Sequence, residues 1–116
     1  MTFTPLSCEE WKPGDFRMGA SLTRGSHAIE DLAAQIGATL EHFVEDGLGP
    51  VKIFRATKVD GRQIAFDFYE SGDQGPNLLV LFENDRCKGS EVLDALAFFG
   101  VEVSDVYWFA PEMEDA

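Results

Sequence analysis

The fold is decided by residues 51–70, VKIFRATKVDGRQIAFDFYE. Two runs rich in β-branched and aromatic residues, 51–59 and 62–70, flank Asp60-Gly61, a dipeptide that favours a tight type I′ hairpin turn. In the second run alternate side chains point to opposite faces of a sheet, with Ile64, Phe66 and Phe68 on one face and Ala65, Asp67 and Tyr69 on the other. We therefore expect an antiparallel hairpin in the middle of the chain.

The hairpin is followed by a strand, a helix and a last strand. Residues 78–82, LLVLF, are apolar on both faces and predict a central strand. Ser90 is placed to cap a helix that ends at Gly100. The apolar residues of that helix are Val92, Leu93, Leu96, Ala97 and Phe99. The last strand begins at Val103 or Val106 and ends at Phe109.

Before the hairpin, the sequence predicts one short strand and one long helix. Residues 1–14 read as an irregular lead-in, and residues 15–22 alternate between polar and apolar. A helix is predicted from a Ser26 cap to Gly47, with Gly37 inside it at a cost of about 1 kcal/mol. Its buried stripe comprises Ile29, Leu32, Ala33, Ile36, Leu40, Phe43 and Val44.

These elements predict one α+β domain over residues 1–116, with two helices on a mostly antiparallel sheet in the order (β)-α-β-β-β-α-β. The 116 residues, 45% of them hydrophobic, suffice for a core. Residues 111–116 form an acidic tail. Cys8 and Cys87 fit no metal or redox spacing, and we expect two reduced thiols. With neither a signal peptide nor a membrane-spanning run in this sequence, we expect a cytoplasmic protein.

The charge is strongly acidic and is concentrated in the second half of the chain. The formal net charge is −12 at pH 7. Residues 59–116 carry thirteen acids and three bases, a charge of −10, and residues 1–58 carry eight acids and six bases, a charge of −2. Such a field attracts cations and opposes contact with phosphates, which need clustered Lys and Arg. We expect a basic protein partner, no direct nucleic-acid binding and no membrane binding.

The sequence shows no catalytic or cofactor motif. His27 and His42 stand too far apart on the predicted helix to share a metal ion. Neither Gly25-Ser26 nor Gly89-Ser90 forms a nucleophile elbow, and the glycines of residues 47–50 follow a helix instead of opening one. We expect no enzyme, metal or cofactor. Carboxylate pairs for glycoside chemistry depend on the fold and stay open.

Three consecutive rings, Tyr107-Trp108-Phe109, mark the candidate binding surface. If only one face of their strand is core, at least one ring lies near solvent; if both faces are covered, all three are buried. An exposed ring among carboxylates has the composition of a hot spot for a basic partner. The candidate partner-binding residues are Asp67, Tyr69, Glu70, Asp73, Glu83, Asp85, Asp105, Tyr107, Trp108, Glu112 and Glu114.

In size, acidity, α+β pattern and lack of catalytic motifs, the chain resembles bacterial immunity proteins, which neutralise toxin domains. This resemblance is to a class of protein and assigns no residues. It implies a monomer that blocks the active site of a basic toxin, including toxins that act on nucleic acid. Two alternatives stay open: a small acidic secretion chaperone, usually dimeric, that binds an effector segment, and a phage-type inhibitor that mimics DNA.

Overall fold

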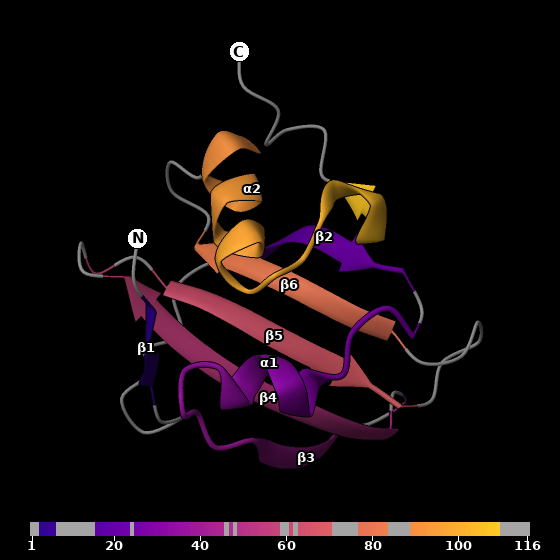
Figure 1. The fold of residues 1–116 in the computed structure, drawn as a ribbon. Helices are drawn as coiled ribbons and strands as arrows, with labels where there is room; N and C mark the ends of the chain where they lie inside the picture. Colours follow the sequence, from indigo (N-terminus) through magenta and orange to yellow (C-terminus); the bar gives the residue numbers. More distant parts are fainter. Residues whose placement is uncertain are drawn as a thin grey trace.

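An antiparallel sheet of seven strands forms the centre of the molecule in the computed structural model (Figure 1). The structure describes residues 3–6, 16–23, 25–45, 47, 49–58, 61, 63–70, 77–83 and 89–109. The strands are β1 (Phe3–Leu6), β2 (Phe16–Leu22), β3 (Glu41–Glu45), β4 (Gly49–Lys58), β5 (Gln63–Tyr69), β6 (Asn77–Glu83) and β7 (Val106–Phe109). In space the order is β1-β4-β5-β6-β2-β7, and β3 also pairs with β4.

The predicted antiparallel hairpin strands are confirmed as β4 and β5. Phe54 and Phe66 stack across the two strands with ring centroids 4.8 Å apart, and both are buried. The pairing runs from Val51 opposite Tyr69 to Thr57 opposite Gln63. The tight turn predicted from Asp60-Gly61 includes residues that lie outside the described part of the chain.

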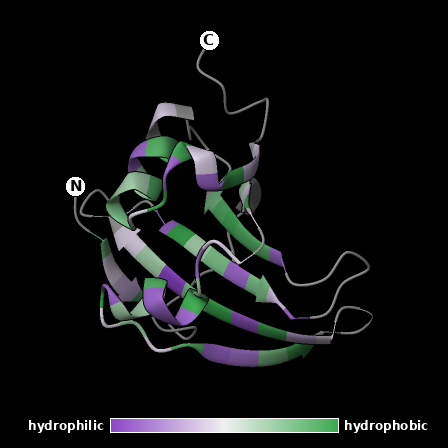
Figure 2. Ribbon diagram, turned by 45° about the vertical axis from the view of Figure 1, so that its right-hand side comes forward, coloured by the Kyte–Doolittle hydropathy of each residue, from purple (hydrophilic) through white to green (hydrophobic). Residues whose placement is uncertain are grey.

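Two helices, α1 (Ile29–Ala34) and α2 (Gly89–Phe98), pack on one face of this sheet (Figure 1). The residues of α2 and its C-terminal turn that face the sheet are spaced three and four apart and buried: Val92, Ala95, Leu96 and Phe99. The Phe99 ring meets the edge of Phe66 at a centroid distance of 4.9 Å. Figure 2 shows hydrophobic residues on α2 and along the strands. Burial of this apolar surface is the main force that holds the helices on the sheet.

The first helix is much shorter than the helix predicted over residues 26–47, because α1 ends at Ala34. Gly37 adopts φ +69°, a left-handed conformation that glycine takes at little cost. The Ala38 N–H donates to the Ala33 carbonyl at 2.9 Å, the hydrogen bond of a Schellman helix end. Gly37 therefore terminates the helix that we expected it only to weaken.

Two further features of the predicted helix are corrected by the structure. Residues 41–45 form β3, in which Phe43 and Val44 pair with β4 instead of extending a helical stripe. Ser26 does not cap α1: its hydroxyl donates to the Thr23 carbonyl at 2.6 Å, and the N-cap position is Ala28. A spacing of three and four over a short stretch fits helix–turn–strand as well as one helix, which explains the error.

The lead-in predicted as irregular contains a strand, because Phe3–Leu6 form β1 and pair with residues 55–58 of β4. Phe3 is buried against Phe98 and Phe99, with ring centroids 5.3 and 5.5 Å away. A strand of four residues is too short to show a clear alternation in the sequence. β1 and β3 thus divide one edge of β4, with β3 on residues 49–53 and β1 on residues 55–58.

The coarse fold is confirmed: a single compact α+β domain with a mostly antiparallel sheet and two helices. The strand predicted at residues 78–82 is β6, the strand before Phe109 is β7, and Gly100 follows α2 as expected. The order differs from the predicted one by the addition of β1 and β3. No helix within the described part of the chain has both the length and the apolarity to cross a membrane. Cys8, Cys87 and the predicted acidic tail lie outside the described residues.

Candidate functional site

Exposed apolar side chains are concentrated in the stretch of chain that runs from α2 to β7. Six large hydrophobic side chains are exposed among the described residues, and four of them lie between residues 93 and 108: Leu93, Val103, Tyr107 and Trp108. Val103 and Tyr107 are the most open of these four, at 71% and 74% exposure. Concentrations of this kind mark binding surfaces more often than scattered single residues do. With the exposed Asp94 and Glu102 of the same stretch, these four residues are called the α2–β7 surface below.

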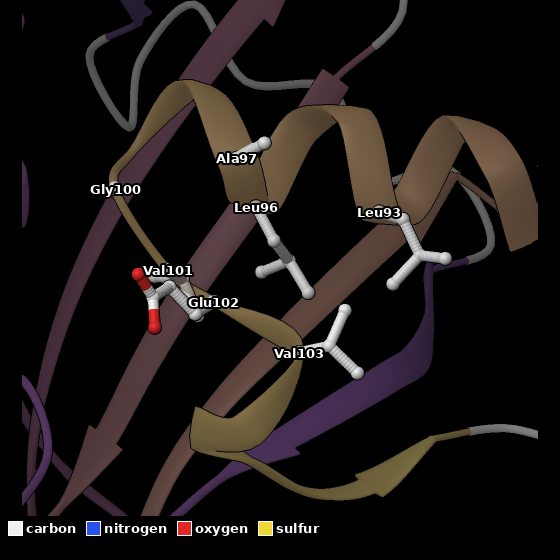
Figure 3. Close-up of a pocket in the computed structure, with 7 residues that line it drawn as sticks. All are labelled: Leu93, Leu96, Ala97, Gly100, Val101, Glu102 and Val103. Carbon is white, nitrogen blue, oxygen red and sulfur yellow. The ribbon is translucent and has the colours of Figure 1, made fainter.

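A groove of about 430 Å³ runs between α2 and the segment that follows it (Figure 3). Its lining is apolar apart from one carboxylate, and comprises Leu93, Leu96, Ala97, Gly100, Val101, Glu102 and Val103. In Figure 3, Leu93 on α2 and Val103 on the facing segment point toward one another, while Glu102 lies nearer the turn at Gly100. The groove is large enough for a few side chains of a partner.

The end of α2 creates this groove by turning the chain back along the helix. Gly100 adopts φ +76°, and the Val101 N–H donates to the Leu96 carbonyl at 2.9 Å. This is again a Schellman end, and Val101 is buried beside the helix as that motif requires. Residues 102–105 then run alongside α2 without filling the space between them. The groove therefore follows from the position of one glycine.

The chain that forms the α2–β7 surface carries only acidic charges. Residues 89–109 contain four carboxylates and neither Lys nor Arg: Glu91, Asp94, Glu102 and Asp105. Asp94 and Glu102 are exposed. The side chain of Glu91 lies outside the described residues. An apolar groove whose one charged lining residue is Glu102 favours a cationic ligand with an apolar group.

Asp105 holds the segment next to the groove in place. Its carboxylate accepts hydrogen bonds from Nε2 of His27 at 3.0 Å and from the Glu102 N–H at 3.2 Å. The hydrogen bond from His27, followed by that from Glu102, lowers the pKa of Asp105 below its usual value. The predicted site residue Asp105 is thus half-exposed and engaged in a capping box.

Tyr107 and Trp108 lie on β7, the last strand of the sheet. Trp108 pairs with Ser21 and Val106 pairs with Leu22, so the register shifts at Tyr107. This irregularity breaks the strict alternation that the sequence predicts for the three rings. Both Tyr107 and Trp108 are exposed. Trp108 shares the face of Ser21, which is the face away from the helices because Ala20 and Leu22 belong to the core beneath them. The Trp108 ring is therefore exposed on the other side of the sheet from the groove.

Asp67 lies far from this surface and is buried. Its carboxylate meets the guanidinium of Arg55 at 2.8 Å, and each of the two side chains is only 9% exposed. Burial raises the pKa of Asp67, against the opposing effect of Arg55. Asp67 is therefore not available to a partner in this structure, and we leave it out of the proposed surface.

The other predicted residues do not gather with β7. Tyr69 is half-buried between Val51 and Asn77, and Glu70 is exposed with its carboxylate 3.3 Å from the ammonium of Lys52. Tyr69 ends β5 and Glu70 follows it, and β6 and β2 separate β5 from β7. Glu70 therefore lies apart from Glu102 of the groove. Asp73, Asp85, Glu112, Glu114 and the side chain of Glu83 lie outside the described residues.

Four residues of the α2–β7 surface were absent from the candidates predicted by sequence: Leu93, Asp94, Glu102 and Val103. For Leu93, one signal in the sequence could have identified it. Leu93 and Ala97 are spaced four apart and lie beside the buried stripe of α2, not within it. A second apolar strip next to a core stripe indicates a further contact on the same helix.

No family model matches the chain, and no curated protein or solved structure is similar to it in our comparisons. Among the residues that the structure describes, no group of three or more His, Cys, Asp or Glu side chains is placed to hold a metal ion. The interpretation of the site therefore depends on its own chemistry, which is that of an apolar groove with an acidic border.

Proposed function

We propose that this chain is a small, non-enzymatic acidic protein that binds a basic partner protein and neutralises it, as bacterial immunity proteins neutralise toxins. One observation carries the proposal: the main concentration of exposed apolar side chains coincides with a stretch of chain that has only acidic charges. The partner would have a cationic surface with at least one apolar side chain that enters the groove.

The carboxylates and the apolar side chains of the α2–β7 surface would contribute to binding in different ways. Asp94, Glu102 and the net charge of −12 would accelerate encounter with a cationic protein at low salt. Leu93, Val103 and Tyr107 would slow dissociation, because buried apolar and aromatic contacts dominate the energy of most interfaces. A surface of this type holds a cationic active site closed without any chemistry of its own.

The proposal is tested by capturing the partner and measuring its affinity for matched variants. The tagged protein is incubated with a lysate of its source cells at low salt, and bound proteins are eluted with salt and identified. We expect Glu102→Lys to weaken binding of the purified partner by about tenfold or more. The charge-matched control Asp31→Lys, at an exposed position on α1, should bind as the wild type does.

Neutralisation is measured separately from binding. Expression of the captured partner alone should harm the host cell, and co-expression of the wild-type chain should restore growth while Glu102→Lys should not. Equal affinity of Glu102→Lys and Asp31→Lys for the partner, or a partner that stays fully active in the complex, would contradict the proposal.

The groove also favours a second candidate, an acidic secretion chaperone that binds an effector segment. A chaperone of this kind would present its apolar groove to an extended chain and would be a homodimer. Light scattering after size exclusion distinguishes the two candidates. A monomer that forms a one-to-one complex with a folded basic protein supports the inhibitor, and a dimer that binds an unfolded segment supports the chaperone.

A further inference from the structure

The groove beside α2 has an apolar end and an acidic end (Figure 3). Leu93 and Val103 point toward one another at the apolar end, and Glu102 lies at the other end, near the turn at Gly100. Leu93 and Gly100 are seven residues apart, which corresponds to about 10 Å along a helix axis. A ligand that lies along the groove therefore meets apolar side chains over most of its length and a carboxylate at one end.

The apolar lining is suited to the carbon chain of a ligand. Leu96 and Val101 are buried, and Leu93, Ala97 and Val103 are exposed beside them. A ligand that covers the three exposed side chains removes apolar surface from water, which favours binding.

Glu102 supplies a negative charge that the described chain does not balance. Its side chain accepts the Asp105 N–H in the capping box, an uncharged donor that leaves further lone pairs of the carboxylate available. No Lys or Arg among the described residues forms an ion pair with Glu102. The C-terminal end of a helix also attracts cations, and the last turn of α2 contains no basic residue. The acidic end therefore favours a cation that another molecule supplies.

An arginine side chain combines the two properties that this groove favours. Its methylenes pack along apolar surface while its head stays polar, and its guanidinium is more weakly hydrated than the ammonium of lysine. A neutral apolar side chain would cover Glu102 without supplying a partner for its charge. A second copy of this chain is also a poor occupant, because both copies would carry the net charge of −12.

We propose that the groove holds one arginine side chain of the basic partner, with its methylenes between Leu93 and Val103 and its guanidinium at Glu102. This inference rests on the proposed function and narrows it, because one residue of the partner supplies both the cation and the apolar group that enters the groove. Glu102 would select for the charge of that residue, and the apolar end would select for a long side chain over a short one.

The test uses butylguanidinium as a probe of the arginine side chain. Its controls are n-butylurea, an uncharged molecule of the same shape, and methylguanidinium, which lacks the long carbon chain. Titrations followed by the amide and methyl resonances of residues 93–103 measure the three affinities. We expect butylguanidinium to bind about fivefold more tightly than either control. Its butyl protons should show nuclear Overhauser contacts with the methyl groups of Leu93 and Val103.

Two variants separate the contributions of the two ends. Glu102→Gln should weaken butylguanidinium binding by about fivefold and leave butylurea binding unchanged, because the new amide oxygen can still accept the Asp105 N–H. Val103→Ser should weaken the binding of both molecules, since it removes apolar surface from the groove. Asp31→Asn on α1 removes the same charge as Glu102→Gln and should bind both as the wild type does. All three positions are exposed, so the variants should fold, which circular dichroism verifies.

The inference and the proposed function can fail separately. Equal affinity for butylguanidinium and butylurea would overturn the inference in favour of a neutral apolar ligand. Equal affinity of the wild type and Glu102→Gln for butylguanidinium, or resonance shifts confined to residues outside 93–103, would also overturn it. If a basic partner is captured and butylguanidinium does not compete with it, the proposed function stands without the inference. If the probe binds as expected but no basic protein is captured, the proposed function fails and the preference of the groove for guanidinium remains.

Discussion

At the scale of single residues, the pair of Arg55 and Asp67 shows why an acidic residue is not always a binding residue. Both lie on the sheet face opposite the helices, at diagonal positions on β4 and β5. Their 2.8 Å contact is buried, so neither charge reaches solvent freely. The alternation in the sequence places Asp67 on the other face of β5 from Phe66 and Phe68. It does not show that this other face of the sheet is also buried.

The buried pair makes a prediction for stability. We expect Arg55→Met to lower the free energy of unfolding by about 3–5 kcal/mol, since it leaves the Asp67 carboxylate buried without its cation. The double variant Arg55→Met, Asp67→Leu should recover most of this loss, because apolar pairs often replace buried ion pairs at little cost. Urea denaturation of the single and double variants measures both effects. A double variant less stable than either single variant would show that the pair does not act as a unit.

At the scale of elements, the two glycines that end the helices decide both the fold and the groove. Gly37 and Gly100 adopt left-handed conformations and close Schellman motifs after α1 and α2. The sequence predicted that α2 ends at Gly100, but it did not predict that α1 ends just before Gly37. β4, β5 and α2 were predictable because each carries a clear period of its own, and β6 because it is a continuous apolar run. β1 and β3 were not, because they are short and their pairing with β4 is a long-range property.

The turn after α2 can be tested at Gly100. A β-carbon at this position would meet no atom within 4 Å, so Gly100→Ala acts through backbone strain alone. We expect it to cost about 1–2 kcal/mol of unfolding free energy. Gly100→Asn is the matched control and should cost less, because Asn tolerates the left-handed conformation better. Thermal denaturation of both variants measures the difference, and a fully stable Gly100→Ala would show that the turn relaxes.

At the scale of the whole molecule, the acidic candidates predicted from the sequence do not all share one surface among the described residues. Asp67 is buried beside Arg55, and Glu70 lies with Lys52 and Glu30. Glu102, which was not among the candidates, lines the groove. The exposure of Tyr107 and Trp108 was foreseeable from three consecutive rings, whereas the groove depends on how α2 packs against the segment after it.

The net charge predicts how a basic partner would associate. The rate of association should fall by about tenfold or more between low and physiological salt, while the rate of dissociation should change little. Surface plasmon resonance with the immobilised partner measures both rates. Tyr107→Ala should instead raise the dissociation rate and leave the salt dependence intact, because the ring carries no charge. An association rate that is independent of salt would show that electrostatic steering does not contribute to binding.

The position of β2 has a consequence for how the protein is made. β2 precedes both of its neighbours, β6 and β7, by more than fifty residues. Until residues 77–109 have been translated and have left the exit tunnel, residues 16–22 have neither neighbour available and the sheet stays open. A nascent chain stalled before residue 77 should therefore lack the closed sheet and remain accessible to chaperones.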